Sequence, residues 1–123
     1  MIVDVTDLIV YRNSLKLLRP VYRLSKLIPK SHFKLRTQFV TSAEAISPLI
    51  AEGYGKKKSE KEFKRFLEMA MGSSDETITH LREIKILSEV CRNIKPETCE
   101  ALIAQYKIIS KQLQNLIKNW KTF

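Results

Sequence analysis

Residues 50–76 read IAEGYGKKKSEKEFKRFLEMAMGSSDE, and this stretch decides the fold. It ends one amphipathic segment at two glycines, passes through three consecutive lysines and opens a second amphipathic segment at Ser59. Ser59 and Glu62 have the Ser-x-x-Glu spacing of a capping box, which marks the start of a helix. The stretch therefore predicts a helix, a tight turn and a second helix.

Apolar residues recur at spacings of three and four on both sides of this turn, which is the pattern of amphipathic helices. The periodicity predicts helices at about residues 7–28, 34–52, 59–91 and 96–120. Four helices with short connections pack as an antiparallel up-down-up-down four-helix bundle. We expect a single all-α domain over residues 1–123, because this length suits one core.

Local signals predict the ends and bends of these helices. Thr6 or Asp7 is expected to cap the first helix, because a side-chain oxygen can accept from an exposed backbone N–H. Gly53 is expected to end the second helix, because glycine adopts the left-handed conformation of a C-cap at no steric cost. Pro20 and Pro48 lie inside helices and predict bends, since proline cannot donate a backbone hydrogen bond.

Small residues interrupt the third helix near its middle. Gly72, Ser73 and Ser74 are poor helix formers, but the apolar periodicity continues beyond them. We therefore expect the helix to continue, and the small residues to let a neighbouring helix approach closely.

The first helix carries more apolar surface than one packed face of a bundle requires. The first stripe consists of Leu8, Tyr11, Leu15, Leu18 and Tyr22. The second stripe consists of Val10, Leu17, Val21, Leu24 and Ile28. The extra stripe favours contact with a neighbouring subunit, and the alternative is a wide core face on this helix.

The net charge of +9 on 123 residues favours a polyanionic partner, either nucleic acid or an acidic membrane surface. The alternative is a basic surface that serves only solubility.

Three groups of basic residues are candidates for phosphate contact. The first choice is the turn before the third helix with the start of that helix, at Lys56, Lys57, Lys58, Lys61, Lys64 and Arg65. The second choice is a line on one face of the first helix, at Arg12, Lys16, Arg19, Arg23 and Lys26. A third group lies on the fourth helix, at Lys107, Lys111, Lys118 and Lys121.

A single run of charge is usually a solvated face, but three runs on one small domain favour nucleic-acid binding. Lysines contact phosphates rather than base edges, so binding should tolerate different sequences. The turn lysines stand at the start of the third helix, where free N–H groups also favour an anion. The alternative is a mobile turn that the lysines keep solvated.

The sequence contains no catalytic or metal-binding constellation. His32 and His80 lie far apart, and no His-x-x-x-His pair, Glu-x-x-His pair or Gly-rich phosphate loop occurs. We expect His32 to be exposed and His80 to lie at a helix boundary. Cys91 and Cys99 lack metal-ligand spacing, so we expect reduced thiols, with a disulfide across the intervening turn as the alternative. These features indicate a non-enzymatic protein without metal or cofactor.

No stretch of the sequence approaches the roughly 18 apolar residues of a membrane span. The N-terminal residues also lack the basic region that opens a secretory signal. We expect a soluble, cytoplasmic protein that does not bind membranes.

Four short motifs mark the sequence. Residues 7–11 read DLIVY and residues 50–56 read IAEGYGK. Residues 61–67 read KEFKRFL and residues 70–73 read AMGS. In this order they resemble the Asp-Leu-x-Val-Tyr, Ile-Ala-Glu-Gly-Tyr/Phe-Gly-Arg/Lys, Lys-Glu-Phe-x-Arg-Phe-Leu and Ala-x-Gly-Ser motifs of the four-helix-bundle family of proteins encoded within 23S rRNA intervening sequences. The likeness extends from Asp7 through the fourth helix.

The chain departs from the family pattern at two places on the second helix. The family commonly has Ile-Pro-Ser-Asn before the Ile-Ala-Glu-Gly motif, whereas residues 46–49 read ISPL. It also often carries an Arg-Arg pair, where this chain has Val40 and Thr41. We expect no nucleic-acid contact from these two positions.

The resemblance implies a bundle that assembles as a ring, commonly a homopentamer. It also implies a relationship to the accessory variability proteins of diversity-generating retroelements, in which a basic pentamer is thought to bind nucleic acid and the polymerase. We therefore expect a non-enzymatic homo-oligomer, with a pentamer favoured, that binds rRNA or other structured RNA. The alternatives are a protein-binding adaptor, such as a reverse transcriptase accessory protein, and a passenger protein without binding activity.

Overall fold

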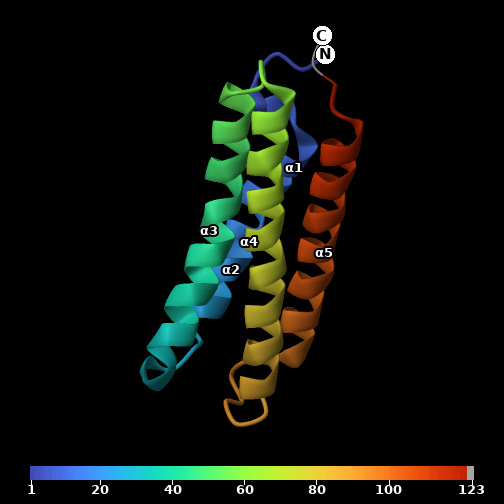
Figure 1. The fold of residues 1–123 in the computed structure, drawn as a ribbon. Coiled ribbons are helices and arrows are strands. Elements are labelled where there is room, and N and C mark those ends of the chain that lie inside the picture. Colours follow the sequence, from blue (N-terminus) through green and yellow to red (C-terminus); the bar gives the residue numbers. More distant parts are fainter. Residues whose placement is uncertain (122–123) are drawn as a thin grey trace.

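The computed structural model describes residues 1–121, and all regular secondary structure in this range is helical (Figure 1). The elements are η1 (Val5–Asp7), α1 (Ile9–Lys16), α2 (Leu18–Ser25), η2 (Lys30–His32), α3 (Phe33–Gly55), α4 (Glu60–Leu87) and α5 (Pro96–Asn119). We call α1 and α2 together the α1–α2 arm. This arm, α3, α4 and α5 alternate in direction, which confirms the expected four-helix bundle (Figure 1). Helix α4 packs along α3 on one side and α5 on the other, whereas the α1–α2 arm packs on α3 and contacts α5 less.

The expected first helix is divided at Leu17 into α1 and α2. Pro20 has no N–H to donate to the carbonyl of Lys16, so the hydrogen-bond ladder is broken one turn before the proline. The Leu17 N–H still donates to the Asn13 carbonyl at 3.2 Å, which carries the helical path across the break. The disturbance expected at Pro20 is therefore present, but it divides the segment into two helices, and the prediction of one bent helix over residues 7–28 is wrong. Helix α3, in contrast, continues across Pro48.

The cap predicted for the first helix is wrong. Helix α1 begins after Leu8, which makes no side-chain cap. A short 3₁₀ turn precedes it instead, and the Asp4 carboxylate caps this turn by accepting from the Thr6 N–H at 3.1 Å. The Asp7 carboxylate folds back to accept from the N–H groups of Val3 at 2.9 Å and Asp4 at 3.0 Å. The two aspartates therefore stabilise the segment that leads into the arm.

The predicted C-cap at Gly53 is also wrong, because α3 continues to Gly55 and its C-cap residue is Lys56. No glycine of the described chain has a positive φ. Gly53 is buried, and a Cβ atom there would lie 2.7 Å from the Phe66 Cβ and 3.2 Å from the Phe63 Cδ1. Helix α4 therefore approaches α3 so closely at Gly53 that a side chain there would not fit without a shift.

Helix α4 continues through its small residues, as expected, but Gly72 does not admit a neighbouring helix. Gly72 is exposed, and a Cβ atom there would meet nothing within 4 Å. Ser74 makes the interhelical contact instead, because it is fully buried and its hydroxyl donates to the Tyr106 carbonyl on α5 at 3.1 Å. The Ser110 hydroxyl donates to Ser74 in turn, at 2.8 Å. Helix α4 ends at Leu87, earlier than predicted, whereas the bounds of α5 agree within one residue.

The core lies between the α1–α2 arm, α3, α4 and α5, and it buries one apolar stripe of the arm. The buried residues of this stripe are Val10, Val21, Leu24 and Ile28. The other stripe is only partly covered, since Leu8 is buried whereas Leu15 and Tyr22 remain 42% and 38% exposed. Tyr11 and Leu18 of this stripe pack against the core, so the expected wide core face is present in part and only the face at Leu15 and Tyr22 is open.

Two further sequence predictions concern cysteine and histidine. Cys91 and Cys99 are free thiols, as expected, and burial raises the pKa of Cys99 above its ordinary value. His32 is exposed, as expected. His80 lies inside α4 rather than at its end, and its ring nitrogens contact the carboxylates of Glu83 at 2.7 Å and Glu76 at 3.2 Å.

Candidate nucleic-acid interface

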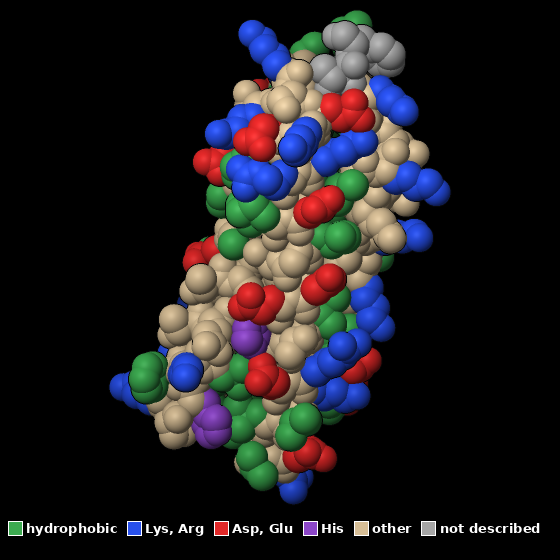
Figure 2. Space-filling model, in the orientation of Figure 1, with side chains coloured by type: hydrophobic (Ala, Val, Ile, Leu, Met, Phe, Trp, Pro, Cys, Tyr) green, Lys and Arg blue, Asp and Glu red, His purple; other side chains and the backbone are tan. Residues whose placement is uncertain are grey.

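The first-choice basic residues gather at the turn between α3 and α4, at one end of the bundle. We call this group the tip cluster, which comprises Lys56, Lys57, Lys58, Lys61, Lys64 and Arg65. Figure 2 shows this end of the molecule as a mixture of basic and acidic side chains rather than a uniform basic patch. The tip cluster is thus brought together, but acidic residues accompany it.

Aromatic rings hold several cations of the tip cluster. The Lys56 Nζ lies 5.4 Å from the centre of the Phe66 ring, and the Arg65 guanidinium carbon lies 4.6 Å from the same ring. The Lys57 Nζ lies 4.1 Å from the centre of the Tyr54 ring. The negative face of an aromatic ring attracts a cation at these distances. The turn is therefore held by its own aromatic residues and is not merely a solvated loop.

Carboxylates offset much of the charge of the tip cluster. Lys64 pairs with Glu60 at 2.7 Å and Arg65 pairs with Glu62 at 3.0 Å. The hydrogen bond from Arg65, aided by the nearby lysine charges, holds the pKa of Glu62 below its ordinary value. Residues 52–68 contain six basic and four acidic side chains, so the net charge of this segment is only +2.

The first turn of α4 has a side-chain cap and acidic residues of its own, which interact favourably with the free N–H groups and the positive end of the helix dipole. The Ser59 hydroxyl accepts from the Glu62 N–H at 3.2 Å, which confirms half of the predicted capping box. The Glu62 carboxylate pairs with Arg65 instead of completing the box. Because Glu60 and Glu62 stand in the first turn of α4, the positive end of the helix dipole already has anionic neighbours. These contacts leave less capacity for an external phosphate than the sequence suggested.

The second-choice residues form a cleaner basic surface on the α1–α2 arm. We call them the basic line, which comprises Arg12, Lys16, Arg19, Arg23 and Lys26. All five are exposed, and within residues 1–121 no carboxylate forms an ion pair with any of them. Arg12 donates to the Thr6 carbonyl at 2.7 Å, and this bond leaves its charge uncompensated. In the view of Figure 2 the arm lies behind α3 and α4, as Figure 1 shows, so the basic line is not the surface in front.

The basic line belongs to a longer segment without acidic residues, residues 8–43, which we call the acid-free segment. The periodicity of helical faces does not reveal this segment. Residues 8–43 contain eight basic side chains and no acidic one. The segment continues from the basic line through Lys30 in η2 and through Lys34 and Arg36 at the start of α3. Its net charge of +8 compares with +9 for the whole chain. A count of acidic residues along the chain would have found this segment, because the signal is the absence of Asp and Glu.

The basic residues of α5 are exposed along that helix, and Figure 2 shows them along its edge. Lys107 and Lys111 line a hollow of about 590 Å³ between α4 and α5, together with Arg82 and Asp75. Lys118 lies near the C-terminal end of α5, Lys121 follows the end of that helix, and neither lines this hollow. The α5 group is therefore a secondary basic surface with an acidic residue in it.

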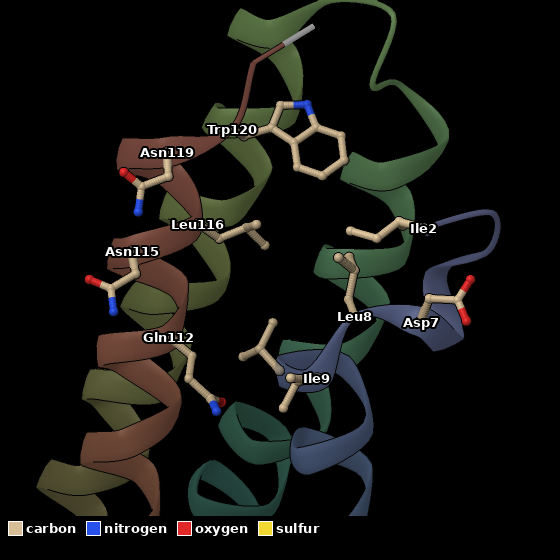
Figure 3. Close-up of a pocket in the computed structure, with 10 residues that line it drawn as sticks. Ile2, Asp7, Leu8, Ile9, Gln112, Asn115, Leu116, Asn119 and Trp120 are labelled. Carbon is tan, nitrogen blue, oxygen red and sulfur yellow. The ribbon is translucent and has the colours of Figure 1, made fainter.

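An apolar groove separates α1 from α5 near the end of the bundle where the chain begins (Figure 3). Ile2, Leu8, Leu116 and Trp120 point into the groove, which has a volume of about 410 Å³. Ile9 lies at its edge and is 59% exposed. Together with the partly open stripe of the arm, this groove gives the protein an apolar surface without a partner in the single chain.

Within the described residues, no group of three or more His, Cys, Asp or Glu side chains is placed to hold a metal ion. Over the same part of the chain, none of the helices combines the length and the apolar character that a membrane crossing requires.

The fold and the charge distribution define a basic, all-helical bundle protein. The model of the 23S rRNA-intervening sequence protein family matches residues 6–115, so the chain belongs to this family. This match confirms the resemblance that the four sequence motifs indicated. No curated protein matches the sequence.

Proposed function

We propose that this protein is a non-enzymatic, homo-oligomeric RNA-binding bundle that contacts rRNA or another structured RNA through the α1–α2 arm. The observation that carries the proposal is the acid-free segment of residues 8–43, with its eight basic side chains. Lysine and arginine that neutralise phosphates release condensed counterions, and this release supplies most of the affinity of non-specific nucleic-acid binding.

The basic line suits phosphate binding better than the tip cluster, because carboxylates pair with cations at the tip. At the tip, Lys64 and Arg65 already have carboxylate partners at 2.7 Å and 3.0 Å. A phosphate that approached the tip would compete with these carboxylates and would feel their repulsion. Within the described residues no carboxylate forms an ion pair with the basic line, so an incoming phosphate meets less competition there than at the tip.

The apolar surface of the single chain supports self-assembly, with a homopentamer as the favoured form. Leu15 remains partly exposed on the arm, and the groove between α1 and α5 is open beside Ile9. Contiguous exposed apolar surface is typical of protein contact sites. Assembly would multiply the charge of +9 by the number of subunits and would add avidity for a long polyanion.

Two variants with the same net charge test the proposal. Each exchanges three cations for glutamine, which lowers the net charge from +9 to +6, and in the arm variant glutamine keeps a good helix former. The arm variant carries Lys16→Gln, Arg19→Gln and Arg23→Gln, and the tip variant carries Lys56→Gln, Lys57→Gln and Lys58→Gln. Binding to a structured RNA is measured as a function of salt concentration, and sedimentation of the same samples gives the number of subunits.

We expect the arm variant to lose more affinity than the tip variant. Three lost phosphate contacts should also reduce the slope of log K against log salt by about 2 to 3. Folding should be nearly unchanged in both variants, because exposed substitutions rarely alter stability by more than about 0.5 kcal/mol. An equal loss in the two variants would show that only net charge matters, and a wild-type protein that binds no RNA at low salt would refute the proposed function.

A further inference from the structure

A second feature of the acid-free segment is a hollow between α2 and α3. Tyr22 and Ser25 line it from α2, and the α3 residues that line it are Phe33, Arg36, Thr37, Val40 and Thr41. Its volume is about 440 Å³, which lies in the range of small-molecule sites, about 300 to 1,000 Å³. The lining combines aromatic rings, hydroxyl groups and a guanidinium, and it includes no carboxylate.

The aromatic residues of this hollow are accessible. Phe33 opens α3, is 70% exposed and stacks on no other aromatic ring of the described chain. One exposed apolar side chain needs no explanation in itself. Phe33, however, shares the hollow with Tyr22 and with Arg36, and Arg36 forms no ion pair within residues 1–121. An exposed ring beside an uncompensated guanidinium is the combination that binds unpaired bases in proteins that recognise RNA.

The charge around the hollow also suits a nucleotide. Lys26, the last residue of the basic line, lies one helical turn from Tyr22 and so on the same side of the arm. Glu44 is the acidic residue in contact with a lining residue, since it accepts a hydrogen bond from the Tyr22 hydroxyl at 2.5 Å. This bond raises the pKa of Tyr22, and it places one carboxylate near the hollow together with the cations Arg36 and Lys26.

We propose that the hollow binds one unpaired nucleobase of an RNA loop, stacked on Phe33. Arg36 would contact the base plane or the adjoining phosphate, and the hydroxyls of Thr37 and Thr41 would face the base edge. The basic line would hold the phosphates of the same strand. A base inside an A-form duplex cannot reach such a hollow, so the site distinguishes looped from fully paired RNA. This inference rests on the proposed RNA binding and adds to it the kind of RNA that is preferred.

The test uses a hairpin RNA with 2-aminopurine in its loop and a fully paired RNA of the same length. Stacking on an aromatic ring quenches 2-aminopurine fluorescence, so the probe reports the contact itself. The variant Phe33→Leu keeps the apolar side chain and removes the ring, whereas Phe33→Tyr keeps the ring. The control Ile86→Ala alters another exposed apolar residue, on α4 and outside the hollow.

We expect the wild type to quench the loop probe and to bind the hairpin more tightly than the duplex. Phe33→Leu should weaken hairpin binding by about 5- to 100-fold, because one base stacked on an aromatic side chain contributes this much. Its salt dependence and its binding of the duplex should stay unchanged, since no charge is lost. Phe33→Tyr should restore quenching and affinity, and Ile86→Ala should match the wild type.

Two results would overturn the inference while RNA binding itself stands. The first is equal hairpin affinity and equal quenching for the wild type and Phe33→Leu. The second is a change in the number of subunits in Phe33→Leu with RNA affinity unaffected, which would make the hollow a contact between copies of the chain. Failure of the wild type to bind either RNA would instead refute the proposed function.

Discussion

Replacement of Gly53 by alanine tests how α3 and α4 pack at the tip of the bundle. The new Cβ would lie 2.7 Å from the Phe66 Cβ, closer than two such carbons approach in proteins. The Phe66 Cβ is bonded to the backbone of α4, so a rotamer change cannot relieve the clash and the helices must separate locally. Overpacking of this kind costs about 1 to 3 kcal/mol.

Helix propensity acts in the opposite direction at the same site. Alanine is favoured over glycine inside a helix by about 1 kcal/mol. Gly72 provides the matched control, because it also lies inside a helix but a Cβ atom there would meet nothing within 4 Å. We expect Gly72→Ala to stabilise the protein by about 0.5 to 1 kcal/mol. Gly53→Ala should be less stable than Gly72→Ala by the steric term alone, about 1 to 3 kcal/mol.

Urea-induced unfolding followed by circular dichroism measures both variants. All samples need the same protein concentration, because assembly would make stability depend on concentration. If the free energies of unfolding of the two variants agree within about 0.5 kcal/mol, the argument from close packing at Gly53 is refuted.

Two further predictions concern the ends of helical segments. Ser59→Ala removes the hydroxyl that accepts from the Glu62 N–H at 3.2 Å, so it should lower the free energy of unfolding by about 1 kcal/mol. Ser59→Asp should retain the cap, and its free energy of unfolding in the same urea assay should stay near that of the wild type. The N–H donors of Val3 and Asp4 favour the charged form of Asp7 and lower its pKa below the ordinary value of 3.8. The stabilisation from Asp7 is therefore complete above that value and lost as the pH falls through the lower pKa of the folded state. An NMR titration of the Val3 and Asp4 amides should give a midpoint below 3.8, and a midpoint at or above 3.8 would contradict the hydrogen bonds.

Local signals in the sequence predicted most of the helices well. The spacing of apolar residues located α3, α4 and α5, because a helix places residues three and four apart on one face regardless of what packs against it. The cap at Ser59 and the interruption caused by Pro20 likewise depend on atoms within one turn of the chain. The η1 turn and the early end of α4 escaped prediction, because short 3₁₀ segments and helix ends have weak sequence signals.

The candidate site was predicted in part. The sequence identified both the basic line and the tip cluster, but it ranked the tip first, where free N–H groups at the start of the helix also favour an anion. The structure shows Lys64 and Arg65 engaged by Glu60 and Glu62, and it leaves the basic line without carboxylate partners in the described chain. The sequence shows only how many charged residues a segment contains. A phosphate site depends on which of these charges have no opposite charge beside them in the folded protein.

The sequence by itself determined the helical class, the family and the excess of basic charge of this protein. These properties follow from periodicity, from short motifs and from composition, which need no knowledge of contacts between helices. Only the tertiary structure decided that Gly53, and not Gly72, lies at a close helix contact, and that Phe33 shares a hollow with Tyr22. The physical reason is that these relations join residues on different helices. The relative position of two helices is set by how their side chains interlock over their whole length, and no single stretch of sequence records it.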